Sequence, residues 1–197
     1  MTKSPPVLIV PGLNNSGATH WQSHWFERLD GAVWVDQTDW ELPKLGDWVA
    51  SLVQSIREHP GAILVGHSLG CALIAHVAQL RGNRGIGGAL LVAPADVNRH
   101  GPAGKLLQGF SPMPQQRLGF PSIVVASETD PYVSIDRAEE FSRSWGSRFV
   151  NLGPAGHINV ASGHGAWSEG LPLLEELREE SGAVRARSAT PLQQAEA

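Results

Sequence analysis

The 197-residue chain contains one cysteine, Cys71, and this scarcity limits the kinds of protein that it can be. A single cysteine cannot form a disulfide within the chain, which excludes a secreted disulfide framework. The N-terminus also has no long apolar run. Only Val7–Val10 precede Pro11-Gly12, and this run is too short for a signal peptide or a membrane span. We therefore expect a cytoplasmic protein with no membrane partner.

The sequence has no block of consecutive basic residues. Its 15 Lys and Arg are outnumbered by 19 Asp and Glu. A net charge of -4 without a basic cluster predicts no nucleic-acid partner and favours a small neutral or polar molecule. The hydrophobic content of 42% is enough for a core within one domain, which we expect over residues 1–180. Residues 181–197 have almost no large apolar side chains and predict a disordered tail.

Short apolar runs alternate along the chain with segments whose apolar residues recur at helical spacing. Strands are predicted at 7–10, 32–35, 61–65, 88–93, 122–126 and 148–152, and helices at 21–29, 45–56, 71–80, 135–145 and 167–179. Residues 94–121, which contain Gly and Pro, predict a long loop with a short helix. Alternation of this kind predicts an α/β fold with a mostly parallel central sheet between helical layers.

The sequence Gly66-His67-Ser68-Leu69-Gly70 lies between an apolar strand and a helix of small apolar residues. Strand, Gly-x-Ser-x-Gly and helix in this order is typical of a nucleophile elbow, in which glycines allow the strand and the helix to approach closely. Ser68 is therefore the candidate nucleophile. The alternative is a glycine-bounded turn with a surface serine.

A nucleophilic serine needs a base and an acid that orients the base, both at later strand ends. Asp130 directly follows the predicted strand 122–126, and His157 follows the strand ending near residue 152. Their alternative roles are a turn-initiating Asp before Pro131 and a hydrogen-bonded loop histidine.

Three other residues are weighed for these roles. Asp96 is the alternative acid from one strand earlier, and His164 is the alternative base near the last helix. His67 adjoins the nucleophile, but its side chain should point away from the Ser68 hydroxyl.

Backbone N–H groups at the start of a helix are suited to stabilising an oxyanion. Leu69 and Leu13 are the predicted donors, because Pro11-Gly12 brings the loop of Leu13 close to the elbow. Asn14, His20 and Trp21 are tentative substrate-binding residues beside this loop. His20 and His24 are spaced to share a metal ion, but no third ligand is evident, so we expect no metal and no cofactor.

The residues quoted above resemble the small serine hydrolases of the α/β-hydrolase superfamily related to retinoblastoma-binding protein 9 and YdeN. The resemblance covers most of residues 7–177 and also includes His20-Trp21-Gln22 and Gly156-His157-Ile158-Asn159. It implies an α/β-hydrolase fold with little or no lid, and it implies Ser68, Asp130 and His157 as the triad. The Leu-x-Cys-x-Glu motif used in pocket-protein binding has no counterpart, because Leu69-Gly70-Cys71-Ala72-Leu73 lacks the glutamate. A pocket-protein partner is not supported.

The favoured function is a serine hydrolase that cleaves esters of small to medium acyl groups through an acyl-serine intermediate. An amidase or peptidase would use the same residues. A binding protein on a hydrolase scaffold, with no catalytic role for Ser68, is the alternative from another class.

Overall fold

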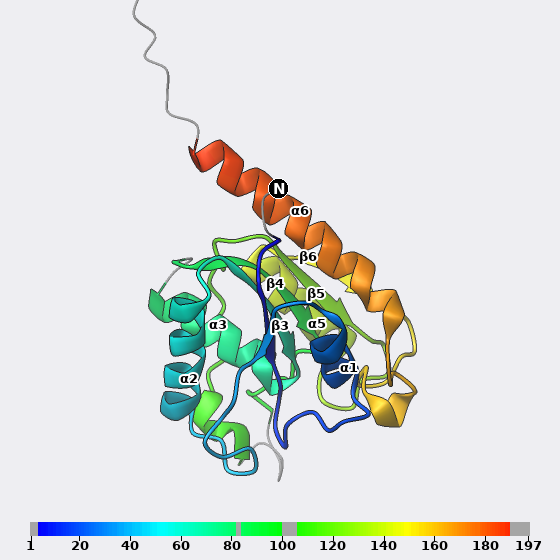
Figure 1. Ribbon diagram of the computed structural model, residues 1–197. Helices are drawn as coiled ribbons and strands as arrows, with labels where there is room; N and C mark the ends of the chain where they lie inside the picture. Colours follow the sequence, from blue (N-terminus) through cyan, green and yellow to red (C-terminus); the bar gives the residue numbers. More distant parts are fainter. Residues whose placement is uncertain (1–3, 82–83, 100–105, 190–197) are drawn as a thin grey trace, which may run out of the picture.

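The computed structural model describes residues 4–81, 84–99 and 106–189 (Figure 1). The protein folds around a six-stranded sheet. All neighbouring strands are parallel, in the order β2-β1-β3-β4-β5-β6. The strands are β1 (Val7–Val10), β2 (Ala32–Trp34), β3 (Ala62–His67), β4 (Ile86–Val92), β5 (Ser122–Ala126) and β6 (Arg148–Asn151). Because the strands are parallel, their carboxyl ends share one edge of the sheet, where ligands of such folds bind.

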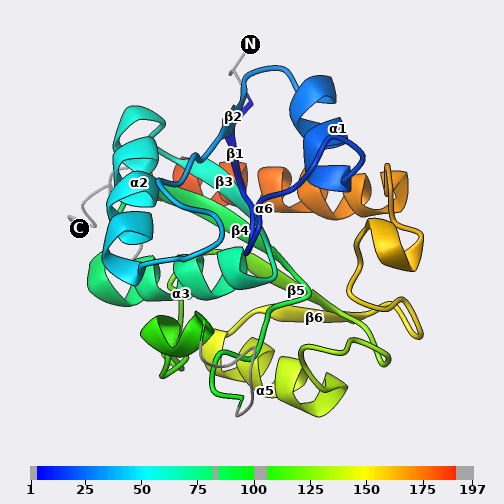
Figure 2. The same cartoon turned by 90° about the horizontal axis from the view of Figure 1, so that it is seen from below.

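Helices cover both faces of the sheet, as Figure 2 shows when the molecule is viewed from below. The helices are α1 (Trp21–Arg28), α2 (Leu45–Glu58), α3 (Leu69–Arg81), α5 (Ile135–Trp145) and α6 (Leu171–Ala189), with 3-10 turns η1 (Gln108–Phe110), η2 (Val160–Ser162) and η3 (Ser168–Gly170). One hydrophobic cluster joins the sheet to α2, α3 and α5, and the other joins it to α1 and α6. This confirms the predicted α/β sandwich of three layers.

The central strands β1, β3, β4 and β5 are almost wholly buried, because side chains of both faces pack against helices. This burial explains why their sequences are continuous apolar runs rather than alternating ones. The edge strands β2 and β6 are only partly buried, and both are short.

The last helix departs from the expected boundaries. Helix α6 begins at Leu171, after the 3-10 turn η3, and continues to Ala189. Ser181 is buried, and its hydroxyl lies where a Cβ on Gly87 would contact it. The prediction of a disordered tail is therefore wrong for residues 181–189. The helix packs against Gly87 through the small side chain of Ser181, so its burial needs no large apolar residue. Residues 190–197 lie outside the described residues.

In its described part, the segment between β4 and β5 has helical residues at Leu106 and Leu107, directly followed by the short 3-10 turn η1. Residues 100–105 lie outside the description, so the expectation of little or no lid stays a prediction. Within the part of the chain that the structure describes, no helix has the length and apolar character needed to cross a membrane.

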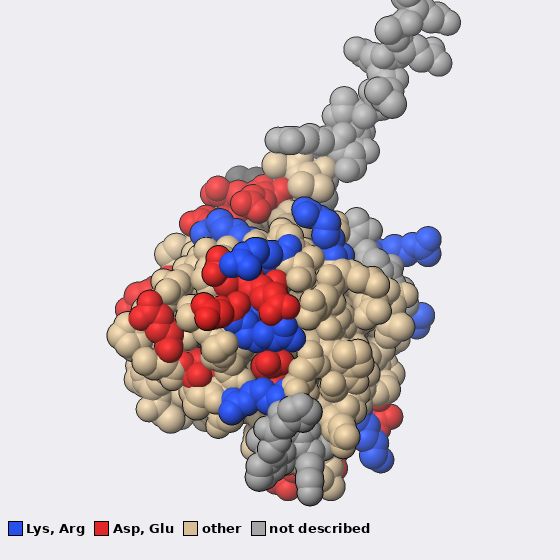
Figure 3. Space-filling model, turned by 180° about the vertical axis from the view of Figure 1, so that it is seen from behind, with Lys and Arg blue, Asp and Glu red and all other residues tan. Residues whose placement is uncertain are grey.

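Acidic and basic side chains are interspersed on the face shown in Figure 3. Four exposed or partly exposed pairs on α5, α6 and β6 join opposite charges: Arg137–Glu140, Arg143–Glu139, Arg148–Glu176 and Arg178–Glu175. Surface ion pairs of this kind contribute little to the free energy of unfolding. Because both signs of charge are mixed across this face, the described residues on it form no large patch of one sign.

Candidate active site

Ser68 occupies a sharp turn between β3 and α3 and has a φ of 54°. This left-handed conformation is costly for a residue other than glycine, so the surrounding backbone must hold it. The Ser68 N–H donates to the carbonyl of Val92 at 3.0 Å, which fixes the turn against β4. The sequence therefore forms the strand, turn and helix that the Gly-x-Ser-x-Gly pattern predicts.

The two glycines beside Ser68 are required by close contacts with backbone. A Cβ on Gly70 would lie 2.2 Å from the carbonyl oxygen of Val10, and a Cβ on Gly66 would lie 3.2 Å from the amide nitrogen of Cys71. Cys71 itself is buried, with its Sγ 3.4 Å from the Val92 carbonyl oxygen. Burial raises the pKa of the Cys71 thiol well above its usual value, so this cysteine is not a reactive nucleophile.

The loop after β1 lies directly against the elbow. A Cβ on Gly12 would be 2.9 Å from the His67 carbonyl oxygen and 3.1 Å from the Leu69 amide nitrogen. Leu13 and Leu69, the two predicted oxyanion donors, both line the pocket that contains Ser68. Leu69 is the first residue of α3, a position at which the backbone N–H has no partner within the helix.

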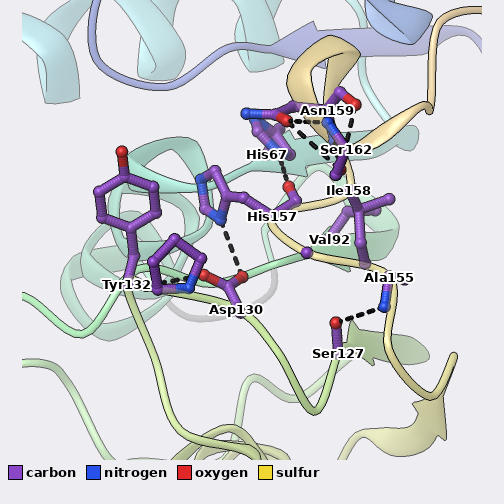
Figure 4. A network of polar contacts seen from close by, with 12 residues as sticks. His67, Val92, Ser127, Asp130, Tyr132, Ala155, His157, Ile158, Asn159 and Ser162 are labelled. Atoms are coloured by element: carbon purple, nitrogen blue, oxygen red, sulfur yellow. Dashed lines mark hydrogen bonds and ion pairs between the residues drawn. The ribbon is translucent and has the colours of Figure 1, made fainter.

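His157 and Asp130 form a hydrogen-bonded pair at the carboxyl edge of the sheet (Figure 4). Nδ1 of His157 lies 2.8 Å from Oδ2 of Asp130, whose side chain has no exposed surface. The other oxygen, Oδ1, accepts the backbone N–H of Tyr132 at 2.8 Å. Because an ionised carboxylate only accepts, the proton of neutral His157 is on Nδ1, which leaves Nε2 free to accept one.

Ser68 and His157 line the same pocket. Among the described residues, no hydrogen bond joins the Ser68 hydroxyl to the His157 ring. Such bonds are often long in unliganded sites and shorten when substrate is bound.

The alternative acid and base have other partners. Asp96 pairs with Arg137 at 3.4 Å, and its Oδ1 accepts the backbone N–H of Asn98. His164 lies beside Ser162, with Nδ1 3.2 Å from its hydroxyl. Neither residue is among those that line the pocket of Ser68.

His67, whose side chain was expected to point away from the Ser68 hydroxyl, has a role that the sequence did not indicate. It lines the pocket, and its Nε2 donates to the backbone carbonyl of His157 at 3.0 Å. Burial, together with the nearby His157 and His20, lowers the pKa of His67 well below its usual value. His67 is thus a neutral donor that anchors the segment carrying His157. A contact across 90 residues leaves no signal in local spacing.

His20 caps α1 and also lines the pocket. Its Nδ1 accepts the backbone N–H of Gln22 at 3.2 Å, and its ring lies 4.8 Å from that of His67. Burial in the wall of the pocket, with smaller effects from His157 and His24, lowers the pKa of His20 to about 4. His20 is therefore neutral at pH 7, with its proton on Nε2 because Nδ1 is an acceptor.

Trp21 does not reach the pocket, so its expected role in substrate binding is wrong. Its side chain is fully buried, and its indole Nε1–H donates to the carbonyl of Ile158 at 2.9 Å. The ring packs against those of Trp25 and Trp167. A buried tryptophan needs a partner for its N–H. Here the partner is the Ile158 carbonyl, and the hydrogen bond joins α1 to the segment that follows His157.

The pocket has a volume of about 290 Å³, which is near the lower limit for small-molecule sites. Six of its lining residues were predicted from the sequence: Leu13, Asn14, His20, Ser68, Leu69 and His157. Others were missed, among them Asn15, Ala95, Leu106, Leu107, Tyr132 and Asn159. Of these, Tyr132 had a usable signal, since an Asp often accepts the backbone N–H two residues later and so fixes that residue beside it.

No three His, Cys, Asp or Glu side chains lie close enough to hold a metal ion in the described ranges. His24, the proposed companion of His20, is exposed, whereas His20 is buried.

A family model described as serine hydrolase matches residues 7–176. The chain belongs to the serine hydrolase family. A protein of Pectobacterium atrosepticum described as a YdeN-like hydrolase has 34% identity and a TM-score of 0.77, with 91% of each chain covered. The ydeN gene product of Bacillus subtilis has 23% identity and a TM-score of 0.72, with 91% of this chain and all of that one covered.

More distant solved structures share the fold. A monoacylglycerol lipase of Paleococcus ferrophilus is 13% identical, with a TM-score of 0.66 over 89% of this chain and 94% of that one. A search of curated proteins finds no match. Family membership and the YdeN-like relative establish a hydrolase of the α/β-hydrolase fold, as the sequence predicted.

Proposed function

We propose that this serine hydrolase cleaves esters of small to medium acyl groups, with Ser68 as nucleophile, His157 as base and Asp130 as the acid that orients it. The observation that carries the proposal is the 2.8 Å bond between the buried Asp130 and His157, which lines the same pocket as a strained Ser68. A carboxylate held without exposure fixes the histidine tautomer that can accept a proton.

In the proposed reaction, His157 Nε2 takes the Ser68 hydroxyl proton while Oγ attacks the ester carbonyl carbon. The backbone N–H groups of Leu13 and Leu69 stabilise the oxyanion that forms. Collapse breaks the bond to the alcohol, which leaves with the proton from His157. Water then attacks the acyl-enzyme in the same way and releases the acid, which returns Ser68 to its starting form.

Labelling with a fluorophosphonate probe tests this proposal, because only an activated serine reacts readily with it. We expect the wild type to be labelled and to cleave 4-nitrophenyl butanoate. Ser68→Ala should lose both labelling and turnover, with activity reduced by roughly 10⁴-fold or more.

Ser168→Ala is the matched control, because Ser168 is exposed and does not line the pocket. It should keep both properties. Full turnover by a folded Ser68→Ala protein would show that another residue is the nucleophile, and an unlabelled, inactive wild type would favour a binding protein on this scaffold.

A further inference from the structure

The pocket has two chemically different sides, and the strand order explains why. Strand β3, which ends at the residue before Ser68, lies between β1 and β4. The loop after β1 and the start of α1 provide Asn14, Asn15 and His20 on one side. Figure 2 shows the segments after β1 and after β4 on opposite sides of the sheet's carboxyl edge.

The second side is apolar and is formed by the segments after β4 and β5. Leu106 and Leu107 come from the first of these segments, and Tyr132 comes from the second. Leu106 and Tyr132 are 44% and 46% exposed, so their apolar surface is open to a ligand. The pocket volume of about 290 Å³ suits a short chain on this side.

His20 is the best-defined polar group of the first side. Its side chain is 8% exposed, and Nδ1 is occupied by the Gln22 backbone N–H. The proton of the neutral ring is therefore on Nε2, which has no acceptor among the described residues. A donor in the wall of a pocket that has no protein partner is one that a ligand is suited to satisfy.

The alcohol of the substrate belongs on the polar side. His157 must protonate the departing alkoxide. Its ring lies between the two sides of the pocket, 4.5 Å from the ring of Tyr132 and 4.8 Å from that of His67, and the His67 ring is 4.8 Å from that of His20. Asn159, two residues after His157, lines the pocket as well, and the Trp21–Ile158 bond ties this segment to the start of α1. A leaving group on the side of His157 that faces His67 rather than Tyr132 therefore has the polar groups of His20 and Asn159 in the same pocket.

We propose that His20 donates a hydrogen bond from Nε2 to a hydroxyl of the leaving alcohol, and that the substrates are esters of short apolar acids with hydroxylated alcohols. This inference rests on the proposed function, because it assigns the two ends of the ester to the two sides of that site. His20 then determines specificity rather than taking part in bond breaking.

Three esters and two variants test the assignment. We compare 2,3-dihydroxypropyl butanoate with propyl butanoate, which has the same acid and carbon skeleton but no free hydroxyl. Propyl 3-hydroxybutanoate carries its hydroxyl on the acid instead. The measured quantity is kcat/KM from the rate of acid release.

The two variants separate the cap from the pocket donor. His20→Asn keeps an oxygen that can accept the Gln22 N–H but is too short to replace Nε2. His20→Gln places an amide N–H near the position of Nε2 but is a poor helix cap. A merely structural His20 would make His20→Gln the more damaging change for every ester, whereas a substrate donor makes His20→Asn the more damaging one for the dihydroxypropyl ester.

We expect the wild type to prefer dihydroxypropyl over propyl butanoate, and His20→Asn to reduce this ratio about three- to tenfold. His20→Gln should retain the ratio within about twofold, despite a lower melting temperature. An unchanged ratio in a folded His20→Asn protein overturns the proposal, as does a stronger preference for propyl 3-hydroxybutanoate. Cleavage of all three esters at equal rates would refute this inference but support the proposed function, whereas cleavage of none with no fluorophosphonate labelling would refute both.

Discussion

At the scale of single residues, the site depends on which groups hold a proton and which accept one. The buried Asp130 fixes the proton of His157 on Nδ1, and the carbonyl of His157 receives the Nε2 proton of His67. Both histidines thus have one defined tautomer, set by an oxygen that can only accept. Both rings are imidazoles, so their different chemical roles follow from their different hydrogen-bond partners.

The substitution Asp130→Asn tests the role of this carboxylate. The amide group introduced by this change would donate to Nδ1 of His157 and shift the ring proton to Nε2, where it blocks the base. We expect kcat/KM for 4-nitrophenyl butanoate to fall by roughly 10³- to 10⁴-fold, by analogy with serine proteases.

Asp96→Asn is the matched control for this change. Asp96 bonds to Arg137 and Asn98 outside the pocket, so this variant should retain activity within about threefold. A larger loss in Asp96→Asn than in Asp130→Asn would assign the acid to the earlier strand.

Residue types and their positions after strands were enough to predict Asp130 and His157 beside one another. They were not enough for Trp21 and His67, whose partners are 137 and 90 residues away. Trp21 follows the loop that lines the pocket, yet its N–H is satisfied by Ile158 within the core. Long-range hydrogen bonds of this kind have no periodicity, so a single sequence does not reveal them.

At the scale of the elements, the elbow requires the β1 loop, β3 and α3 to approach more closely than side chains permit. Gly70 meets the carbonyl oxygens of Val10 and Pro11, and Gly12 meets the backbone of the elbow. Gln22 strengthens the same junction, because its amide donates to the carbonyls of Val10 and Val65 at 3.3 and 3.0 Å. The turn that carries Ser68 is therefore supported by three elements at once.

Gly70→Ala should destabilise this junction. Its Cβ would lie 2.2 and 2.8 Å from two backbone oxygens, which cannot move without displacing β1. We expect the free energy of unfolding in urea to fall by about 3 kcal/mol or more.

Gly46→Ala offers the contrast, because it lies in α2 and its Cβ would meet nothing within 4 Å. Alanine favours the helix, so unfolding should require up to about 1 kcal/mol more. Equal changes in the free energy of unfolding for Gly70→Ala and Gly46→Ala would show that the backbone contacts at Gly70 do not require glycine there.

The strands were predictable because burial on both faces produces uninterrupted apolar runs. β1, β5 and α5 have the boundaries that the sequence predicts. The end of α6 was missed because the prediction relied on large apolar residues, and the helix packs through the small Ser181 instead. Residues 94–121 carry few periodic signals, so Leu106 and Leu107 on the apolar side of the pocket were not predictable either.

At the scale of the whole molecule, burial of histidines links stability to pH. The pKa of His20 is lowered to about 4 and that of His67 is lowered well below its usual value, in both cases mainly by burial. In the unfolded chain both titrate near 6.5. The unfolded state therefore binds more protons below pH 6.5, and stability decreases as the pH falls through this value.

We expect the free energy of unfolding to decrease by roughly 2 to 4 kcal/mol between about pH 7.5 and about pH 5, measured by urea titration. Above about pH 7.5 both histidines are almost wholly neutral in both states, so little change is expected there. Asp39, whose pKa is lowered by the backbone N–H groups of Leu42 and Glu41, acts only near about pH 4 and below.

His67→Gln provides the comparison for this experiment. Glutamine keeps an N–H for the His157 carbonyl but does not titrate, so the decrease should be smaller than in the wild type. His20 and the partly buried His76, whose pKa values are also lowered by burial, still contribute. An identical pH dependence in the variant would mean that His67 is not one of the responsible groups.

The hydrogen bond from Trp21 to Ile158 has a consequence for how this scaffold can diverge. His20 and His157 each adjoin one end of that bond, so their separation is set within the core. Leu106 and Leu107 belong to a different segment, between β4 and β5. With the acid and alcohol sides assigned as proposed, sequence changes there alter the acid that is accepted while leaving the alcohol side and His157 in place, so the two halves of specificity can evolve independently.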